Sequence, residues 1–332
     1  MAKDLDADVV MGGATPLALP IDDEAEKELR RGERRLEAGL GGTKKRLTSR
    51  WATIAAIVIA ALWTLPTFGL FISSFRPREL IQTTGWWTVF ENWGWTVDNY
   101  ATALQTGNSQ LNMAGAFVNS IAITIPATII PISIALLAAY AFAWMNFRGK
   151  NILFIFVFAL QIVPIQMALI PLLQLFSQGT IFGAPVIEGL GAAGYAQVWI
   201  AHTIFALPLA IFLLHNFVSE IPHEVIEAAR VDGAGHGQIF FRLILPLTMP
   251  AIASVAIFQF LWVWNDLLVA LIFADGNVAP ITKLLAEMTG SRGQDWHLLT
   301  AGAFIAIIVP LVVFLLLQRF FVRGLLAGST KG

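Results

Sequence analysis

The sequence contains no cysteine, little charge and almost no net charge. Without cysteine, the chain forms neither a disulfide nor a thiolate metal site or nucleophile. Charged residues make up 13% of the 332 residues, about half of what is usual for a soluble domain. The formal net charge of −1 gives no support for a nucleic-acid partner.

Motifs that carry chemistry are also missing. There is no G-x-x-x-x-G-K-[ST] loop, so we expect the chain not to bind ATP itself. Residues 189–194 match G-x-G-x-x-G, but they follow no strand and precede an apolar run, which excludes a dinucleotide site. No H-E-x-x-H or comparable ligand spacing is found among the histidines, which are His202, His215, His223, His236 and His297. We therefore expect no metal, no cofactor and no catalytic residue in this chain.

What is abundant is apolar sequence, at 57% of the residues. Six runs without Asp, Glu, Lys or Arg are each long enough for a helix of about 20 residues, the length that crosses the hydrocarbon layer. Continuous runs predict helices, because backbone groups in lipid must be satisfied within the segment and a barrel would show short alternating stretches. The predicted fold class is an all-α integral membrane protein with six transmembrane helices. The spans are predicted near 51–74, 116–145, 151–175, 194–217, 249–273 and 298–320.

Lysine and arginine gather on one side of these six spans. They precede the first span, follow the last, and occupy the loops after the second and fourth spans. By the positive-inside rule, both termini are predicted to be cytoplasmic. The opposite side carries only four basic residues, which are Arg76, Arg78, Lys283 and Arg292.

Three segments follow from this pattern. Residues 1–50 are polar, carry dense charges of both signs and begin no apolar run, so they predict a disordered cytoplasmic tail and not a cleaved signal peptide. Residues 51–320 form the membrane domain, and 321–332 form a short cytoplasmic tail. On the outer side, 75–115 is rich in tryptophan, which favours the headgroup layer; it is an interfacial anchor or a docking surface.

The connection 218–248 is long and polar, whereas most other connections are short. Pro222 suits the first turn of a helix, Asp232-Gly233 signals its end, and 238–243 predict a second short helix. The pattern fits an ordinary surface loop with a solvated charged face. It fits equally a docking element whose glutamates accept hydrogen bonds from a partner's Arg or Lys. Its predicted apolar stripe consists of Ile221, Val225, Ala228 and Ala229.

The spacing within this loop resembles the EAA loop of ABC importer permeases. Glu227-Ala228-Ala229 is followed after three residues by Gly233, and after eleven more by Leu245-Pro246. The sequence Asp232-Gly233-Ala234 and the end of the chain, 324–332, are similar to the MalG-like branch, which imports carbohydrates. The run 258–266 resembles α-glucoside permeases in particular. The resemblance covers about 50–332.

This resemblance implies the type I ABC importer permease fold, in the inner or plasma membrane of a bacterium. It implies a second, MalF-like permease subunit, two ATPase subunits that hold ATP and Mg²⁺, and an extracytoplasmic sugar-binding protein, besides membrane lipid. The end of the C-terminal tail would reach between the ATPase subunits: Ser329, Thr330, Lys331 and Gly332. The loop would dock on an ATPase subunit and pass its motion to the spans, through Glu224, Glu227, Ala228, Ala229, Asp232, Gly233, Ala234, Leu245 and Pro246.

Polar side chains within the spans are candidates for the substrate path. An aspartate inside a membrane is costly and is functional or paired as a rule, so Asp266 is a substrate or gate contact, or else a structural partner. Amides offer sugars donors and acceptors and aromatic rings offer stacking surfaces, while helix–helix hydrogen bonding is the competing explanation. The candidates are Asn119, Gln161, Gln166, Trp262, Asn265 and Asp266.

The resulting hypothesis is a permease subunit of an ATP-driven carbohydrate importer for α-glucosides or oligosaccharides, which forms half of the translocation pore. One alternative is an ABC importer permease for a non-sugar solute. Another is a proton-coupled secondary transporter that uses Asp266, for which internal repeats would be expected and are not seen. A membrane-embedded enzyme is disfavoured because the sequence offers no catalytic constellation.

Overall fold

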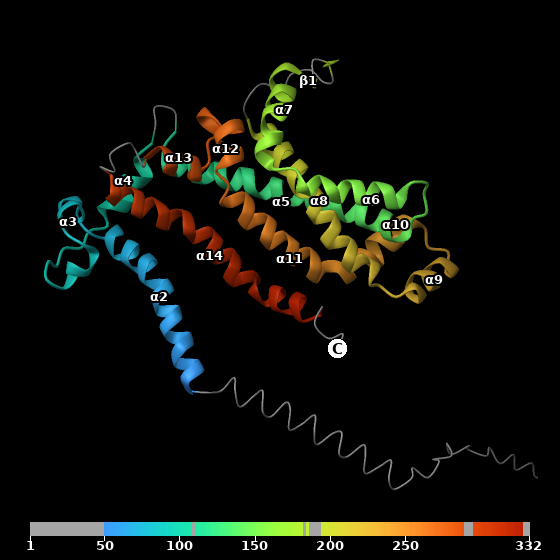
Figure 1. Cartoon of the computed structure of the whole chain (residues 1–332), viewed down its shortest axis with the longest axis horizontal. Coiled ribbons are helices and arrows are strands. Elements are labelled where there is room, and N and C mark those ends of the chain that lie inside the picture. Colours follow the sequence, from blue (N-terminus) through green and yellow to red (C-terminus); the bar gives the residue numbers. More distant parts are fainter. Residues whose placement is uncertain (1–49, 108–110, 182–183, 186–193, 289–294, 328–332) are drawn as a thin grey trace, which may run out of the picture. The chain divides into compact units, whose positions relative to one another are not determined.

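The computed structural model describes residues 50–107, 111–181, 184–185, 194–288 and 295–327, and these are almost entirely helical (Figure 1). Within these residues, five helical stretches are long and apolar enough to cross a membrane, and a bent helix pair brings the number to six when it is counted as one span. The all-α membrane fold is thereby confirmed. The predicted tail up to residue 49 and the tail contacts at 329–332 lie outside the described residues. The five stretches are α2 (Arg50–Ser74), α5 (Met113–Trp144), α8 (Tyr195–Ser219), α10 (His236–Ile239) continuing into α11 (Leu245–Trp264), and α14 (Trp296–Ala327).

The third span is sharply bent, which corrects the prediction of one continuous helix over 151–175. Helix α6 (Lys150–Ala159) continues as the 3₁₀ turn η2 (Leu160–Ile162), and α7 (Ile165–Gln178) then runs at 103° to them. The break falls at Val163, which is extended with ψ 120°, because the ring of Pro164 disfavours a helical conformation before it and supplies no N–H. A two-residue strand pair follows, β1 (Thr180–Ile181) with β2 (Ala184–Pro185).

The predicted fifth span, 249–273, is also interrupted. Helix α11 ends at Trp264, and α12 (Leu268–Phe273) is a separate short helix. Asp266 lies in the gap and accepts hydrogen bonds from the backbone N–H groups of Val269 at 3.4 Å and Ala270 at 3.1 Å. Aspartate is well suited to cap the start of a helix in this way. The chain continues through η4 (Gly276–Val278) and α13 (Ile281–Met288) to α14.

Helix α5 organises the part of the chain that begins at Phe68; the residues up to Thr67 form a separate unit. Its 32 residues make it about 48 Å long at 1.5 Å per residue. One end contributes to a buried cluster with α4 (Asp98–Gln105), α13 and α14, and the middle to a second with α7, α8, α11 and α12. The C-terminal part packs in a third cluster, with the end of α8, with α9 (His223–Val231) and with the start of α11. Figure 1 shows α5 beside α8.

Small side chains let α5 and α8 approach closely. Ala135, Ala139 and Ala201 are fully buried, as is usual where membrane helices pack without a hydrophobic driving force between them. Side chains also donate hydrogen bonds to backbone carbonyls of neighbouring helices. Trp199 donates to Ala122 at 3.1 Å, Gln259 to Ala127 at 3.1 Å and Trp264 to Ala306 at 3.0 Å.

A buried arginine organises the tryptophan-rich segment, which contains α3 (Arg78–Thr83) and the 3₁₀ turn η1 (Trp86–Phe90). The guanidinium of Arg76 is fully buried and donates to the carbonyl of Gly85 at 2.8 Å and the hydroxyl of Thr84 at 2.7 Å. The amide of Asn99 donates to the backbone carbonyl of Arg76 at 2.8 Å. Several large aromatic side chains of this segment are exposed at the surface, and the most exposed are Trp87, Phe90 and Trp93.

We expect these rings to lie in the headgroup layer, where tryptophan is enriched. Because the chain has no cysteine, a single Phe90→Cys variant can carry a polarity-sensitive fluorophore. In liposomes, its emission should shift to the blue, and headgroup-attached nitroxides should quench it more than aqueous iodide does. A label at Asp232, in an exposed turn, is the water-facing control. Equal iodide quenching at both positions would favour a docking surface for a soluble protein instead.

Candidate functional site

Helix α9, within the 218–248 loop, has two distinct faces. His223, Ile226 and Arg230 share the face that meets the membrane domain, and Ile226 is 1% exposed in the cluster formed with α5. The opposite face carries Glu224, Glu227, Ala228 and Val231, all exposed. Positions three, four and seven residues apart share one face of a helix, so the outward face is continuous and combines two carboxylates with small apolar side chains.

The apolar stripe predicted for this loop is only partly correct. Ile221 is buried, but Val225 and Ala228 are exposed, and Ile226 is the buried anchor. The helix begins at His223, after Pro222, so Ile221 precedes it and does not set its orientation. Ile226 has the larger apolar surface to bury, so the helix is turned by about one residue, or 100°.

The turn after α9 requires glycine. Gly233 has φ +79°, a left-handed conformation that only glycine adopts at no cost. The N–H of Ala234 donates back to the carbonyl of Ala229 at 2.9 Å, which closes the helix end. The second helix predicted at 238–243 is α10 followed by a π-helical turn, η3 (Phe240–Ile244), which runs into α11 without a break.

Leu245 and Pro246 therefore lie in the first turn of α11. Pro246 lines a cleft of about 530 Å³ beside α9, which also includes Phe217, Glu220 and Arg242. Val225, which follows Glu224 in α9, also lines this cleft. Of the residues predicted to couple to an ATPase subunit, Pro246 lines this cleft, whereas Leu245 is partly buried against the cluster that holds Ile226.

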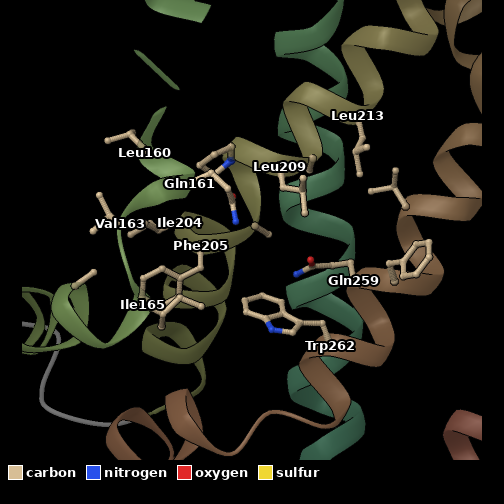
Figure 2. Close-up of a pocket in the computed structure, with 16 residues that line it drawn as sticks. Leu160, Gln161, Val163, Ile165, Ile204, Phe205, Leu209, Leu213, Gln259 and Trp262 are labelled. Atoms are coloured by element: carbon tan, nitrogen blue, oxygen red, sulfur yellow. The ribbon is translucent and has the colours of Figure 1, made fainter. Parts of the chain in front are cut away.

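A second feature is a cavity of about 470 Å³ at the bend of the third span, between η2, α8 and α11. Its wall is mostly apolar, with two glutamines and one indole: Gln161, Gln259 and Trp262 (Figure 2). A concave, mostly apolar surface with a small number of polar groups is typical of a site that binds a small molecule. One amide hydrogen of Gln259 is used on the carbonyl of Ala127.

The structure brings only some of the predicted path residues together. Gln161 and Trp262 share the cavity wall, whereas Gln166 is exposed and lies outside it. Asn265 is exposed and donates to the carbonyl of Leu261 in its own helix at 2.8 Å. Asp266 caps α12, which is a structural role for its carboxylate.

Asn119 is held by the protein itself. Its amide nitrogen donates to the carbonyls of Asn277 at 2.7 Å and Ala279 at 3.0 Å, and its oxygen accepts from the hydroxyl of Tyr195 at 2.5 Å. Both amide hydrogens are therefore occupied, and the side chain ties α5 to the segment before α13.

Asn119→Leu is expected to destabilise the protein and leave substrate affinity unchanged. Each buried partner left without its hydrogen bond costs about 1–3 kcal/mol, so the melting temperature of the purified protein should fall by several degrees. Asn265→Leu, at an exposed position, is the control and should change it little. A large increase in KM for uptake at an unchanged melting temperature would instead make Asn119 a substrate contact.

His202 is a polar residue of this region that the sequence did not single out. It is 1% exposed, its Nε2 lies 3.8 Å from the Asp266 carboxylate, and its ring meets Trp262 edge to face at 5.2 Å. It thereby connects the cavity wall to the cap of α12. A lone histidine in an apolar span gives no spacing signal, so only its position in space identifies it.

Comparison with known proteins places these features in a family. Residues 129–327 match the family described as the binding-protein-dependent transport system inner membrane component. The match covers more than half of the chain and contains α9, its turn and the residues that line the cavity. This chain belongs to that family. It is therefore a membrane component of a binding-protein-dependent transport system, as the loop spacing predicted.

Curated relatives and solved structures agree with the family. The osmoprotective compounds uptake permease protein GgtD of Synechocystis is 55% identical, over 84% of this chain and 91% of the relative. The alpha-glucoside transport system permease protein AglG of Rhizobium meliloti is 38% identical, over 85% of this chain and 97% of the relative. A chain of a bacterial ABC transporter that imports alginate matches with a TM-score of 0.62 at 18% identity, over 84% of this chain and 98% of that one. The last likeness supports the fold alone.

Proposed function

We propose that this chain is a permease subunit of an ATP-driven carbohydrate importer, with α-glucosides or oligosaccharides as substrates. It forms half of a translocation pore with a second permease subunit. Two ATPase subunits dock on the cytoplasmic side, and an extracytoplasmic binding protein delivers the sugar. The relative named for α-glucoside transport, which aligns over 85% of this chain, supports this substrate class.

The observation that carries the coupling role is the outward face of α9. Glu224 and Glu227 are ionisable acceptors on an exposed helix face, suited to arginine or lysine side chains of a partner. Ala228 on the same face lets a partner backbone approach closely. The inward face is fixed to the membrane domain by Ile226, so a force on the outward face is passed to the spans.

The cavity supports a role in the substrate path. Gln161 and Gln259 offer amide donors and acceptors for sugar hydroxyls, and Trp262 offers a ring face for stacking. The second permease subunit completes the path from its own side. ATP and Mg²⁺ belong to the ATPase subunits, and this chain supplies no catalytic group.

Both termini lie on the cytoplasmic side in this proposal. Two of the four basic residues on the opposite side are taken up by the structure. Arg76 is buried in the network described above, and Lys283, 6% exposed, donates to the carbonyl of Ala274 and the carboxylate of Asp275. The hydrogen bond from the Lys283 ammonium group to the carboxylate lowers the pKa of the Asp275 carboxyl. These two cations have a structural use, so they weigh little against the positive-inside rule.

A second candidate substrate class is an osmoprotective compound. The relative at 55% identity is named for the uptake of such compounds. The cavity wall, apolar with three polar groups, suits a small neutral polar solute of either kind. Competition for uptake between an α-glucoside and candidate osmoprotectants distinguishes the two classes.

The test is uptake in liposomes that contain this chain with its second permease and ATPase subunits. Radiolabelled α-glucoside should enter only when ATP and the binding protein are both present. This chain alone, with an imposed pH gradient, should take up nothing. Uptake by the chain alone under that gradient would overturn the proposal and favour a secondary transporter that uses Asp266.

A further inference from the structure

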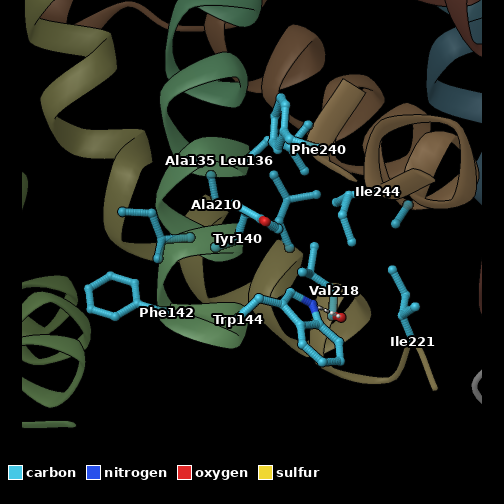
Figure 3. Close-up of a cluster of buried hydrophobic side chains, with 14 of the residues drawn as sticks. Ala135, Leu136, Tyr140, Phe142, Trp144, Ala210, Val218, Ile221, Phe240 and Ile244 are labelled. Atoms are coloured by element: carbon cyan, nitrogen blue, oxygen red, sulfur yellow. Dashed lines mark hydrogen bonds between the residues drawn. The ribbon is translucent and has the colours of Figure 1, made fainter. Parts of the chain in front are cut away.

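Trp144, the last residue of α5, lies where three helices meet. Its indole N–H donates to the carbonyl of Val218 near the end of α8, at 3.2 Å (Figure 3). Its ring packs against His223, the first residue of α9, with 4.7 Å between the ring centroids. The side chain is only 9% exposed, so α5, α8 and α9 are joined at this point.

Arg230, in the last turn of α9, holds the same residue from the other side. Its guanidinium donates to the backbone carbonyl of Trp144 at 3.3 Å. The last carbonyls of a helix have no partner within it, and their combined dipole attracts a cation. Helix α9 therefore holds the end of α5 through its first turn and its last turn, although the two helices are far apart in the sequence.

A second attachment lies one turn earlier on α5. The hydroxyl of Tyr140 is hydrogen-bonded to Nδ1 of His236, the first residue of α10, at 2.8 Å. The Tyr140 ring packs on Phe240 edge to face at 5.5 Å. The loop that carries α9 is thus fixed to α5 by side chains, in addition to its covalent connections to α8 and α11.

We propose that Trp144 and Arg230 form a clamp through which α9 moves α5 in step with α8 and α11, so that both are positioning residues for energy coupling. The inference rests on the coupling role proposed above for α9. Helix α5 contributes to all three buried clusters, and its Ala127 carbonyl binds Gln259 of the cavity wall. Movement of Trp144 is therefore transmitted along α5 to the cavity.

Arg230→Ala tests the clamp in liposomes that contain the assembled transporter. Assembly and ATP hydrolysis should persist, while solute taken up per ATP hydrolysed falls about fivefold, the order expected for one hydrogen bond of ordinary net strength. Arg230→Lys should recover part of the loss because it keeps a charged donor. Arg148→Ala is the matched control: it removes a nearby positive charge from an exposed position and should keep the wild-type ratio.

The outcomes separate the clamp from the coupling role itself. If Glu227→Lys uncouples the transporter in the same preparation and Arg230→Ala does not, the clamp is overturned and the coupling role stands. If both variants keep the wild-type ratio, both are overturned. A loss in Arg230→Ala that Arg148→Ala shows equally would also overturn the clamp, because general charge and not the bond to Trp144 would then be responsible.

Cross-linking provides a second, independent test, because the chain has no cysteine of its own. Tyr140→Cys with His236→Cys, which keeps Trp144 and Arg230 in place, can be joined by a short reducible bifunctional thiol reagent. Since the loop that carries α9 and the end of α5 move together in this proposal, uptake per ATP should be equal in cross-linked and reduced samples of the same variant. Uptake that stops on cross-linking and returns on reduction would show that they separate, which overturns the clamp.

Discussion

Glu227→Lys and Gly233→Pro are each expected to leave the assembled transporter hydrolysing ATP while solute uptake falls about tenfold. A tenfold loss corresponds to ~1.4 kcal/mol of coupling free energy. Glu227 lies on the exposed face of α9, and a lysine there would oppose a basic partner surface, which costs several kcal/mol for like charges. Proline cannot adopt the φ of +79° found at Gly233, so the turn that orients α9 would be lost. The measurement is the ratio of uptake to phosphate release in liposomes.

Two conservative variants serve as controls for these changes. Glu227→Gln keeps an acceptor and should retain part of the coupling. Gly237→Ala should be silent, because an added Cβ there meets nothing within 4 Å. Co-purification of the ATPase subunits shows whether docking or the transmission of movement is affected. Normal uptake in both Glu227→Lys and Gly233→Pro would exclude the coupling role.

Trp262→Ala is expected to raise the KM for sugar uptake about tenfold, ~1.4 kcal/mol, with little change in basal ATP hydrolysis. The indole is part of the cavity wall beside Gln259 (Figure 2), and an aromatic ring supplies both apolar area and a stacking face. Gln161→Ala should have a smaller effect because it removes hydrogen bonds that water can replace in part. The measurement is the concentration dependence of uptake by the complete transporter.

The shape of the cavity is controlled separately from its aromatic surface. Trp262→Phe keeps a ring and should retain most of the affinity. Leu213→Ala enlarges the cavity without removing an aromatic group, and the KM for sugar uptake of this variant should stay near that of the wild type. If Trp262→Ala assembles normally and its KM is unchanged, the cavity is not part of the sugar path.

Spans, loop and family were predictable because their signals are local in the sequence. Each apolar run must satisfy its own backbone and match the hydrocarbon thickness, so span lengths follow from composition alone. The break in the third span was missed for a related reason. An apolar run that contains Pro164 continues on either side of the bend, and hydropathy does not record the extended conformation of Val163.

The path candidates show where local signals end. Asn119, Gln161 and Asn265 are all amides in apolar surroundings, and the sequence treats them alike. Their roles differ because their neighbours differ: Asn119 binds backbone 158 and 160 residues away, Gln161 faces a cavity, and Asn265 bonds within its own helix. A hydrogen-bond partner so distant in the chain cannot be read from spacing.

By itself, the sequence determined that this chain is a helical membrane protein whose 218–248 loop has the spacing of an importer permease. Hydropathy and motif spacing are properties of residues close together in the sequence, so they can be read without knowledge of the tertiary structure. Only the tertiary structure decided which face of α9 is outward, because burying Ile226 against α5 fixes the rotation of the helix. It also decided that Trp144 and Arg230 meet, since that contact exists only when the end of α5 and the loop after α8 are packed together.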